Sequence, residues 1–420
     1  MIGAGRASQT VIAENMTRVY ITGIGLLTPI GNTLEEFSES LRAGVSGFRT
    51  IPYFDTAAFP FDQGAVIPEF PADLSALVAD HPEWETAEHY GVHCASVALA
   101  DAGISVDALD PFRTAVVVAS SNAGVETNHA HAENKLSNQV TRGSTIVRTP
   151  ATVTAAIRRT LGVRGPQAAV STACAAGSNS VGMAYDFIRA GHADVAIAGG
   201  TEPFSMLSYS GFTLLKSLTH RTLRPFDENR DGTGLGEAAC MFVLESAESA
   251  IARGATVYGE VCGYGLSDDA YHATAPDPSG AGAVLAITQC LADARLRPED
   301  VDYINAHGTG TRYNDAMELA ALSHVFGPDL TRIPISSTKP LHGHTLSCAG
   351  SLEMLVCLAA LGGGFVPGNL GTTEPMREFP GLNLPTASFE AEGMTVAISN
   401  SFGFGGNNTC IAVRRVGRGD

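Results

Sequence analysis

The chain has 420 residues, of which 45% are hydrophobic and 16% are charged, and its formal net charge is −17. This composition is too apolar for a disordered protein, and the length is sufficient for two core-forming halves. The acidic balance argues against nucleic acid or an anionic membrane as the main partner. It does not exclude an acidic protein partner that docks on a local basic patch.

The eight cysteines are scattered, mostly inside apolar runs, and none forms a CxxC pair. This distribution predicts reduced thiols in a cytoplasmic protein. We find no apolar run approaching the roughly 18 to 20 residues that span a bilayer, and no secretory signal at the N-terminus, so we expect no membrane association. Residues 1–16 are predicted to form a flexible extension, with Met16, just before a strong strand, as an alternative start.

The apolar pattern predicts alternating strands and helices in the first part of the chain. In order, we expect a strand over 18–31, a helix capped by Asn32 and ending at Leu41, surface loops with short helices over 44–85, a helix over 89–102 and a strand over 114–119. The polar segment 126–148 contains His129 and His131, which could bind a metal. A solvated helical insertion is the preferred interpretation there.

Cys174 lies between a short apolar strand, 168–170, and a helix-like run with Val181, Ala184 and Ile188 on one face. A helix N-terminus offers unpaired N–H groups and positive dipole character, which lower the pKa of a thiol. We therefore consider Cys174 a candidate nucleophile. The alternative is a buried, inert cysteine, which is common among small residues.

The second part of the chain repeats the order of the first. After strands over 194–202 and 239–244, the segment 258–267 resembles 19–28 in its alternation and its Gly-x-Gly ending. A helix over 281–296 and a strand over 303–306 then repeat the earlier helix and strand. This duplication predicts two α/β halves, 17–257 and 258–416, with mainly parallel sheets and sites at the carboxyl ends of the strands. The glycine-rich loop 223–237 lacks the lysine of a phosphate-binding loop, so we expect no nucleotide site.

Two further loops at strand ends contain reactive groups. The loop 307–318 follows the strand 303–306, and the loop 336–350, with Lys339 and His344, leads into a helix from Ser351. Cys174, His307 and His344 could form a zinc site, but zinc would occupy the thiolate and leave Lys339 unexplained. Carbon–carbon chemistry on a thioester fits better, because a thiolate accepts an acyl group and neutral imidazoles donate to an enolate oxygen.

Four motifs now support a resemblance. The chain resembles the β-ketoacyl-acyl carrier protein synthase II family in these motifs. They are Ser-Thr-Ala-Cys over 171–174, His-Gly-Thr-Gly-Thr over 307–311, Lys339 with Gly-His over 343–344, and the glycine-rich loop 400–406. This family includes the ketosynthase subunits of type II polyketide synthases. The resemblance implies an α/β thiolase-like fold, with two duplicated βαβ-type halves in a layered αβαβα sandwich. It also implies decarboxylative Claisen condensation of malonyl-carrier protein with a cysteine-bound acyl chain.

The resemblance also implies roles for individual residues. Cys174 would be the nucleophile, and His307 and His344 would serve decarboxylation and stabilise the enolate. Lys339 would orient the histidines, with Asp315 and Glu318 in support. The remaining roles are pantetheine binding by Thr309 and Thr311, and a gate at Phe404, whose backbone N–H would join that of Cys174 as an oxyanion hole. We expect core packing for Phe402, and no metal or free cofactor, because acyl carrier protein carries the substrates on phosphopantetheine.

Four positions depart from the family pattern: Asn122, Pro340, His342 and Asn407. Asn122 occupies the place of an aliphatic gate to the acyl pocket, where an unpaired amide would be costly. The alternative is an asparagine held by backbone groups in a turn. We favour a type II polyketide or polyene ketosynthase over a housekeeping fatty-acid elongation enzyme. It would act as a homodimer or as the catalytic partner of a chain-length factor. The remaining alternatives are a non-catalytic, chain-length-setting subunit and a thiolase, whose usual two-cysteine pattern is missing.

Overall fold

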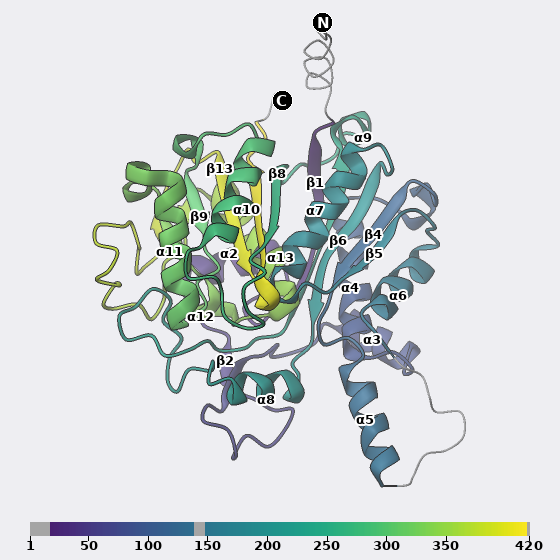
Figure 1. Cartoon of the computed structure of the whole chain (residues 1–420). Coiled ribbons are helices and arrows are strands. Elements are labelled where there is room, and N and C mark those ends of the chain that lie inside the picture. The colour runs from purple at the N-terminus through teal and green to yellow at the C-terminus, as the bar shows by residue number, and fades with distance from the viewer. Residues whose placement is uncertain (1–16, 138–147, 418–420) are drawn as a thin grey trace, which may run out of the picture.

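The computed structural model describes residues 17–137 and 148–417 (Figure 1), so the predicted extension 1–16 lies outside the described residues. Ten strands form one mixed sheet in the order β5-β4-β6-β7-β1-β8-β14-β13-β9-β10. The strands of the N-terminal half are β1 (Val19–Leu27), β4 (Thr114–Ala119), β5 (Gln167–Val170), β6 (Val195–Glu202) and β7 (Ala238–Ser246). Those of the C-terminal half are β8 (Gly259–Asp268), β9 (Tyr303–Asn305), β10 (Ile335–Ser336), β13 (Val396–Phe402) and β14 (Asn407–Arg414).

The order of the strands confirms the duplication. From the junction outward, the strand order is β1-β7-β6-β4-β5 in the N-terminal half and β8-β14-β13-β9-β10 in the C-terminal half. Each strand therefore has a counterpart at the same position in the other half. The halves join where β1 pairs antiparallel with β8, from Val19 opposite Val261 to Ile21 opposite Gly259. The chosen boundary at residue 258 stays a prediction.

The prediction of mainly parallel sheets is wrong. Only the pairs of β4 with β5 and β6, and of β9 with β10 and β13, are parallel among the described strands. β7 and β14 run against their neighbours. β14 returns from β13 through the tight turn 403–406, and β7 returns from β6 after the long excursion 203–237. Both connections join antiparallel strands, so neither is the crossover that parallel neighbours require. The apolar pattern of a strand does not show in which direction it runs.

The helices form three layers around the two halves of the sheet. Their bounds are α2 (Leu34–Ala43), α3 (Ala72–Asp80), α4 (Thr86–Asp101), α5 (Val125–Leu136), α6 (Ala151–Leu161), α7 (Ala176–Arg189), α8 (Met206–Leu214), α9 (Ala247–Ala252), α10 (Ala281–Asp293), α11 (Arg312–Phe326), α12 (Lys339–His342) and α13 (Ala349–Gly363). α4 and α6 cover the outer face of the N-terminal half, and α10 covers that of the C-terminal half with α11 packed beside it. α7 and α13 pack against each other between the halves, which gives the predicted αβαβα sandwich.

Several local expectations change. The segment 44–85 contains a small antiparallel sheet of β2 (Phe48–Thr50) and β3 (Gln63–Ala65). A second two-stranded antiparallel sheet is formed by β11 (Phe365–Val366) and β12 (Phe389–Glu390). Thr33, and not Asn32, caps α2, because its hydroxyl accepts the Glu36 N–H. α5 is the expected exposed helix carrying His129 and His131, although residues 138–147 of that insertion lie outside the described part of the chain.

The expectation that no segment is long and apolar enough to span a membrane is also wrong. The helical stretch Leu346–Gly363 passes that test by length and composition. However, 89% of it is buried inside the protein, where α13 packs against α7 and β13. Its composition is therefore that of a core helix.

The two Gly-x-Gly repeats have the same structural cause. A Cβ on Gly25 of β1 would lie 1.9 Å from the Cys94 carbonyl oxygen of α4, and one on Gly265 of β8 would lie 2.0 Å from the Ala286 oxygen of α10. Each helix thus lies directly on the backbone of β1 or β8, the two strands at which the halves join. Only glycine permits this approach.

Gly25→Ala should therefore destabilise the protein by about 2 kcal/mol or more, because helix α4 must move away from β1. Gly362→Ala, near the end of α13, is the matched control, since an added Cβ there meets no atom within 4 Å. It should be neutral or stabilising by up to about 1 kcal/mol through higher helix propensity. Equilibrium unfolding in urea measures both, and equal effects of the two substitutions would contradict this packing.

Candidate active site

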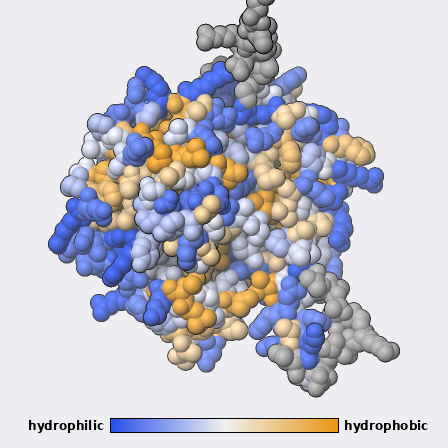
Figure 2. All heavy atoms as spheres, in the orientation of Figure 1, coloured by the Kyte–Doolittle hydropathy of each residue, from blue (hydrophilic) through white to orange (hydrophobic). Residues whose placement is uncertain are grey.

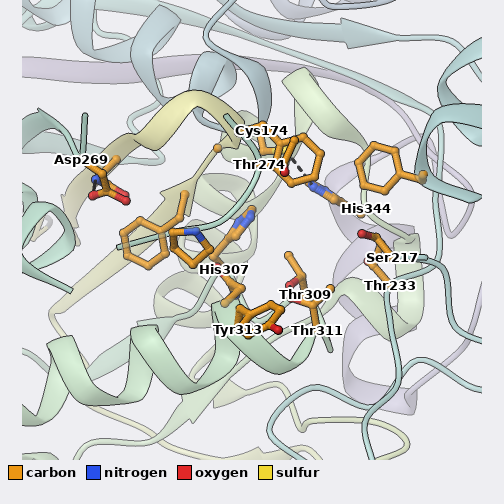
Figure 3. Close-up of a pocket in the computed structure, with 17 residues that line it drawn as sticks. Cys174, Ser217, Thr233, Asp269, Thr274, His307, Thr309, Thr311, Tyr313 and His344 are labelled. Carbon is orange, nitrogen blue, oxygen red and sulfur yellow. Dashed lines mark hydrogen bonds between the residues drawn. The ribbon is translucent and has the colours of Figure 1, made fainter. Parts of the chain in front are cut away.

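Cys174 lies in a single 3-10 turn, Ala173–Ala175, between β5 and α7. Ala173, just before it, has φ +48°, a left-handed conformation that costs energy in a residue with a side chain. This strained turn directs the sulfur into a pocket of about 110 Å³, shown in Figure 3.

The expectation of a lowered thiol pKa is wrong. Burial raises the pKa of Cys174 to about 12, although the Lys339 ammonium and a hydrogen bond from the backbone N–H of Phe404 act in the opposite direction. Desolvation disfavours the charged form of a thiol, and here this effect outweighs the nearby positive groups. The resting thiol is therefore protonated, and any nucleophilic attack by its sulfur would require a proton acceptor.

His344 places a ring nitrogen within hydrogen-bond distance of the Cys174 sulfur. Its Nε2 lies 3.0 Å from the sulfur of Cys174. Burial, together with the Lys339 ammonium, holds the pKa of this imidazole well below its usual range, so it is neutral. Its Nδ1 is buried without a hydrogen-bond partner among the described residues. Nothing in that environment therefore fixes the tautomer of His344.

His307 follows β9 and is held more firmly. Its backbone N–H donates to Glu318 Oε1 at 2.8 Å, and the next N–H, of Gly308, donates to Oε2 at 2.8 Å. The Lys339 Nζ donates to Nδ1 of the ring at 3.3 Å, which places the ring proton on Nε2. Burial and the Lys339 ammonium hold the pKa of His307 well below its usual range. His307 thus presents a neutral N–H donor.

Glu353 of α13 is a site residue that sequence reasoning missed. It forms a fully buried ion pair with Lys339, whose Nζ also donates to the His307 carbonyl oxygen at 2.5 Å. Burial raises the pKa of Glu353 to about 7, against the effect of Lys339. The available signal was a lone carboxylate in the otherwise apolar run 349–363.

The other predicted residues divide into cavity wall and support. Thr309 and Thr311 line the cavity, with their hydroxyl oxygens 2.8 Å apart. Asp315 and Glu318 lie behind the wall, where Asp315 accepts the N–H groups of Gly310 at 3.1 Å and of Phe226 at 2.8 Å. Their carboxylates therefore hold the loop that carries His307 and the threonines.

Two phenylalanines close the cavity on the side of the glycine loop. The Phe404 ring stacks on Phe212 of α8, with centroids 5.5 Å apart. Glycines 405 and 406 follow it with φ +84° and +90°, conformations that favour glycine. Phe402 is buried beside His307, with centroids 6.0 Å apart, and also contributes to the wall.

The departures from the family pattern are hydrogen-bonded or structurally compatible. Asn122 is buried outside the cavity wall; its Nδ2 donates to the Pro203 oxygen at 3.0 Å and its Oδ1 accepts the Ser208 hydroxyl at 2.5 Å. His342 bonds through both ring nitrogens, to Thr338 and Gly343, and burial lowers its pKa to about 3. Asn407 donates to the Phe404 oxygen, and Pro340 lies in the first turn of α12, where proline is tolerated.

Cys174, His307 and His344 converge, as predicted. Their ligand atoms all lie within 4.8 Å of one another. The zinc alternative relies on this same geometry. The Lys339 ammonium beside His307 disfavours a divalent cation there, because like charges in a buried site repel strongly.

Comparisons with known proteins agree with the geometry. The family model "Beta-ketoacyl synthase, N-terminal domain" matches residues 16–250, and "Beta-ketoacyl synthase, C-terminal domain" matches residues 258–373. The chain is 36% identical to 3-oxoacyl-[acyl-carrier-protein] synthase 2 of Synechocystis sp. (strain ATCC 27184 / PCC 6803 / Kazusa), over 95% of this chain and 98% of the relative. It therefore belongs to the β-ketoacyl synthase family.

Solved structures extend this similarity. "The ishigamide ketosynthase/chain length factor" matches with a TM-score of 0.88 and 33% identity, over 96% of this chain and 100% of that one. A ketosynthase from the complex "AntDE:AntF (apo): type II PKS acyl-carrier protein in complex with its ketosynthase bound to the hexaketide" matches with a TM-score of 0.85 and 26% identity, over the same shares. The fold is thiolase-like, and the protein is an acyltransferase with β-ketoacyl synthase activity.

The buried ion pair allows a test of how the site is held. Lys339→Met or Glu353→Met alone should cost about 3–5 kcal/mol, because each leaves an uncompensated charge in the core. The double substitution should cost less than either single one, since both charges are then removed. Equilibrium urea unfolding measures the three values, and additive losses would contradict the pairing. Condensation should fall most in the two variants that lack Lys339, because the His307 tautomer is then no longer fixed.

Proposed function

We propose that Cys174 is the acyl-accepting nucleophile and that His307 and His344 carry out decarboxylative condensation beside it. The observation that supports this assignment is the convergence of one thiol and two neutral imidazoles in a single narrow cavity. Thr309 and Thr311 line the same cavity and would bind the phosphopantetheine arm. No further cofactor is required, because that arm brings the substrate.

In the first half-reaction, the Cys174 sulfur attacks the acyl thioester while His344 Nε2 takes the thiol proton. The tetrahedral oxygen accepts hydrogen bonds from the backbone N–H groups of Cys174 and Phe404. When the bond to the pantetheine sulfur breaks, the leaving sulfur takes the proton from His344. The acyl group is then bound to Cys174 as a thioester.

In the second half-reaction, the malonyl group loses carbon dioxide, and the electron pair of the broken bond forms an enolate. The Nε2–H of His307 donates to the enolate oxygen, and His344 joins it. Because the Nδ1 of His344 has no partner among the described residues, the ring can accept at Nε2 in the first step and donate there in the second. The enolate carbon then attacks the acyl thioester, the carbon–sulfur bond to Cys174 breaks, and the leaving thiolate takes up one proton from water to restore the thiol.

The partner that delivers these substrates is acyl carrier protein, and we place its docking surface at the mouth of the cavity. A second hollow of about 490 Å³ adjoins the first and shares Phe404 and Thr311 with it. Its walls carry Lys216, His220 and Arg312, which are exposed. With one acidic residue, Asp231, in the same wall, these side chains support a local basic patch for an acidic partner on an acidic protein.

Lys216→Glu together with Arg312→Glu should raise the KM for acyl-carrier protein by about tenfold or more, with a smaller effect on kcat, because opposite charges steer and hold the partner. Arg297→Glu is the control, since Arg297 is exposed just before β9, whereas His307 follows that strand at its other end. Steady-state kinetics measure both. An unchanged KM in the double variant would place the docking surface elsewhere.

We propose that the enzyme is a specialised ketosynthase for polyketide or polyene chains. Similarity to synthase 2 and to the ishigamide ketosynthase does not separate this function from housekeeping fatty-acid elongation. The distinguishing observation is the pair of Asn122 with Ser208 of α8, which places polar groups at the predicted acyl gate. With Cys174 intact, the chain would be the catalytic member of a homodimer or of a pair with a chain-length factor. The free, buried cysteines support a cytoplasmic location.

The purified enzyme should therefore extend unsaturated or oxidised acyl-carrier substrates with a kcat/KM about tenfold or more above that for saturated medium and long chains. Asn122→Leu should reduce this preference, while Ser208→Ala should have a smaller effect. Mass spectrometry of acylated Cys174 identifies the loaded chain. Equal extension of saturated chains would indicate the housekeeping enzyme, and failure to acylate Cys174 would indicate the non-catalytic subunit.

A further inference from the structure

Glu202, the last residue of β6, is a buried carboxylate to which the mechanism above gives no role. Its Oε1 accepts the Asn122 N–H at 2.6 Å, and its Oε2 accepts the N–H groups of Ser121 and Ser347, both at 3.0 Å. These donors come from two separate loops. One follows β4 and carries Asn122, and the other follows His344.

A third loop is attached through Ser347. Its hydroxyl donates to the carbonyl oxygen of Ala173 at 3.3 Å and is also hydrogen-bonded to the Ser121 hydroxyl. Ala173 is the strained residue directly before the nucleophile. Glu202 and Ser347 together therefore connect the nucleophile turn, the His344 turn and the loop at the predicted acyl gate.

The charge of Glu202 is unfavourable for the nucleophile. It raises the pKa of both Cys174 and Cys348. No Lys, Arg or His of the described chain forms an ion pair with it, so its burial is compensated by hydrogen bonds alone, from three backbone N–H groups and the Ser347 side chain. Desolvation raises the pKa of Glu202 to about 7. An apolar or amide side chain would avoid both costs, so the carboxylate must provide something that those groups do not.

We infer that Glu202 is a positioning residue for the condensation, whose two acceptor oxygens hold the turns of Cys174 and His344 in register with the acyl-gate loop. An amide cannot replace it, because the NH₂ group would face a backbone N–H of Ser347 or Asn122. This inference rests on the proposed roles of Cys174 and His344. A misplacement of about 1 Å between reacting groups is enough to cost roughly a hundredfold in rate.

The test is Glu202→Gln, measured in two independent ways. Loading of Cys174 by acyl-carrier protein, followed by mass spectrometry, should slow by about tenfold to a hundredfold. Alkylation of Cys174 by iodoacetamide needs no alignment with substrate or His344. It should become at least about threefold faster at a fixed pH between 7 and 9, because removal of the negative charge lowers the thiol pKa. The other charged or titratable groups that face Cys174 are Lys339, Glu353, His307 and His344, and all four are unchanged in this variant.

The control is Glu245→Gln. Glu245 is also a buried strand carboxylate, but it pairs with Arg253 and lies opposite Val195, at the other end of β6. It should destabilise the fold and leave both Cys174 rates unchanged. Slower loading with faster alkylation in Glu202→Gln supports the inference. Unchanged loading, or loss of both rates in parallel, overturns it.

If Glu202→Gln does not fold, Ser347→Ala decides the question. This change removes the hydroxyl link to Ala173 and keeps the backbone N–H to Glu202. Loading should slow by about tenfold with an unchanged pH dependence of alkylation, and loading at the wild-type rate would overturn the inference. Iodoacetamide labelling of the wild type is independent of the substrate. A wild-type enzyme that is alkylated at Cys174 but never loaded would instead contradict the proposed function.

Discussion

Exclusion of water from two imidazoles beside one ammonium group is the condition on which this site depends. Burial and the Lys339 charge keep His307 and His344 neutral, and a neutral ring retains one nitrogen that can accept a proton and one that can donate. The same exclusion of water keeps the thiol of Cys174 protonated at rest. A single environment thus sets the protonation states of all three groups, and Glu353 compensates the charge of Lys339 there.

The duplicated fold supplies the geometry for this environment. Cys174 follows β5 in the N-terminal half, whereas His307 follows β9 and Lys339 follows β10 in the C-terminal half. β5 corresponds to β10 and β4 to β9 in the repeated strand order. The side chains of the candidate site therefore come from equivalent ends of two related sheets. Pairing of β1 with β8, and of α7 with α13, brings those ends together.

Much of this arrangement could be predicted from the sequence, because it depends on local patterns and on ordered motifs. The Gly-x-Gly repeats revealed the duplication, and the motifs around Cys174, His307 and His344 identified the trio. Strand direction could not be predicted, because β7 and β14 have the same apolar pattern whether they run parallel or antiparallel. The thiol pKa was wrong for a related reason. Helix position can be inferred locally, but desolvation depends on how elements distant in sequence enclose the sulfur. Glu353 and Glu202 were missed because a buried carboxylate is recognised by its partners, which only the fold supplies.

The apolar surface in Figure 2 is interrupted by polar side chains, and the most hydrophobic helix of the described chain is not part of it. α13 is instead enclosed between the halves, with α7 on one side and β13 on the other. On a ribosome, α7 is made before α13, but β13 is made after it. The surface that encloses α13 is therefore complete only when the last strands of the chain have been synthesised. Removal of the segment from β13 onward would leave one side of this apolar helix uncovered.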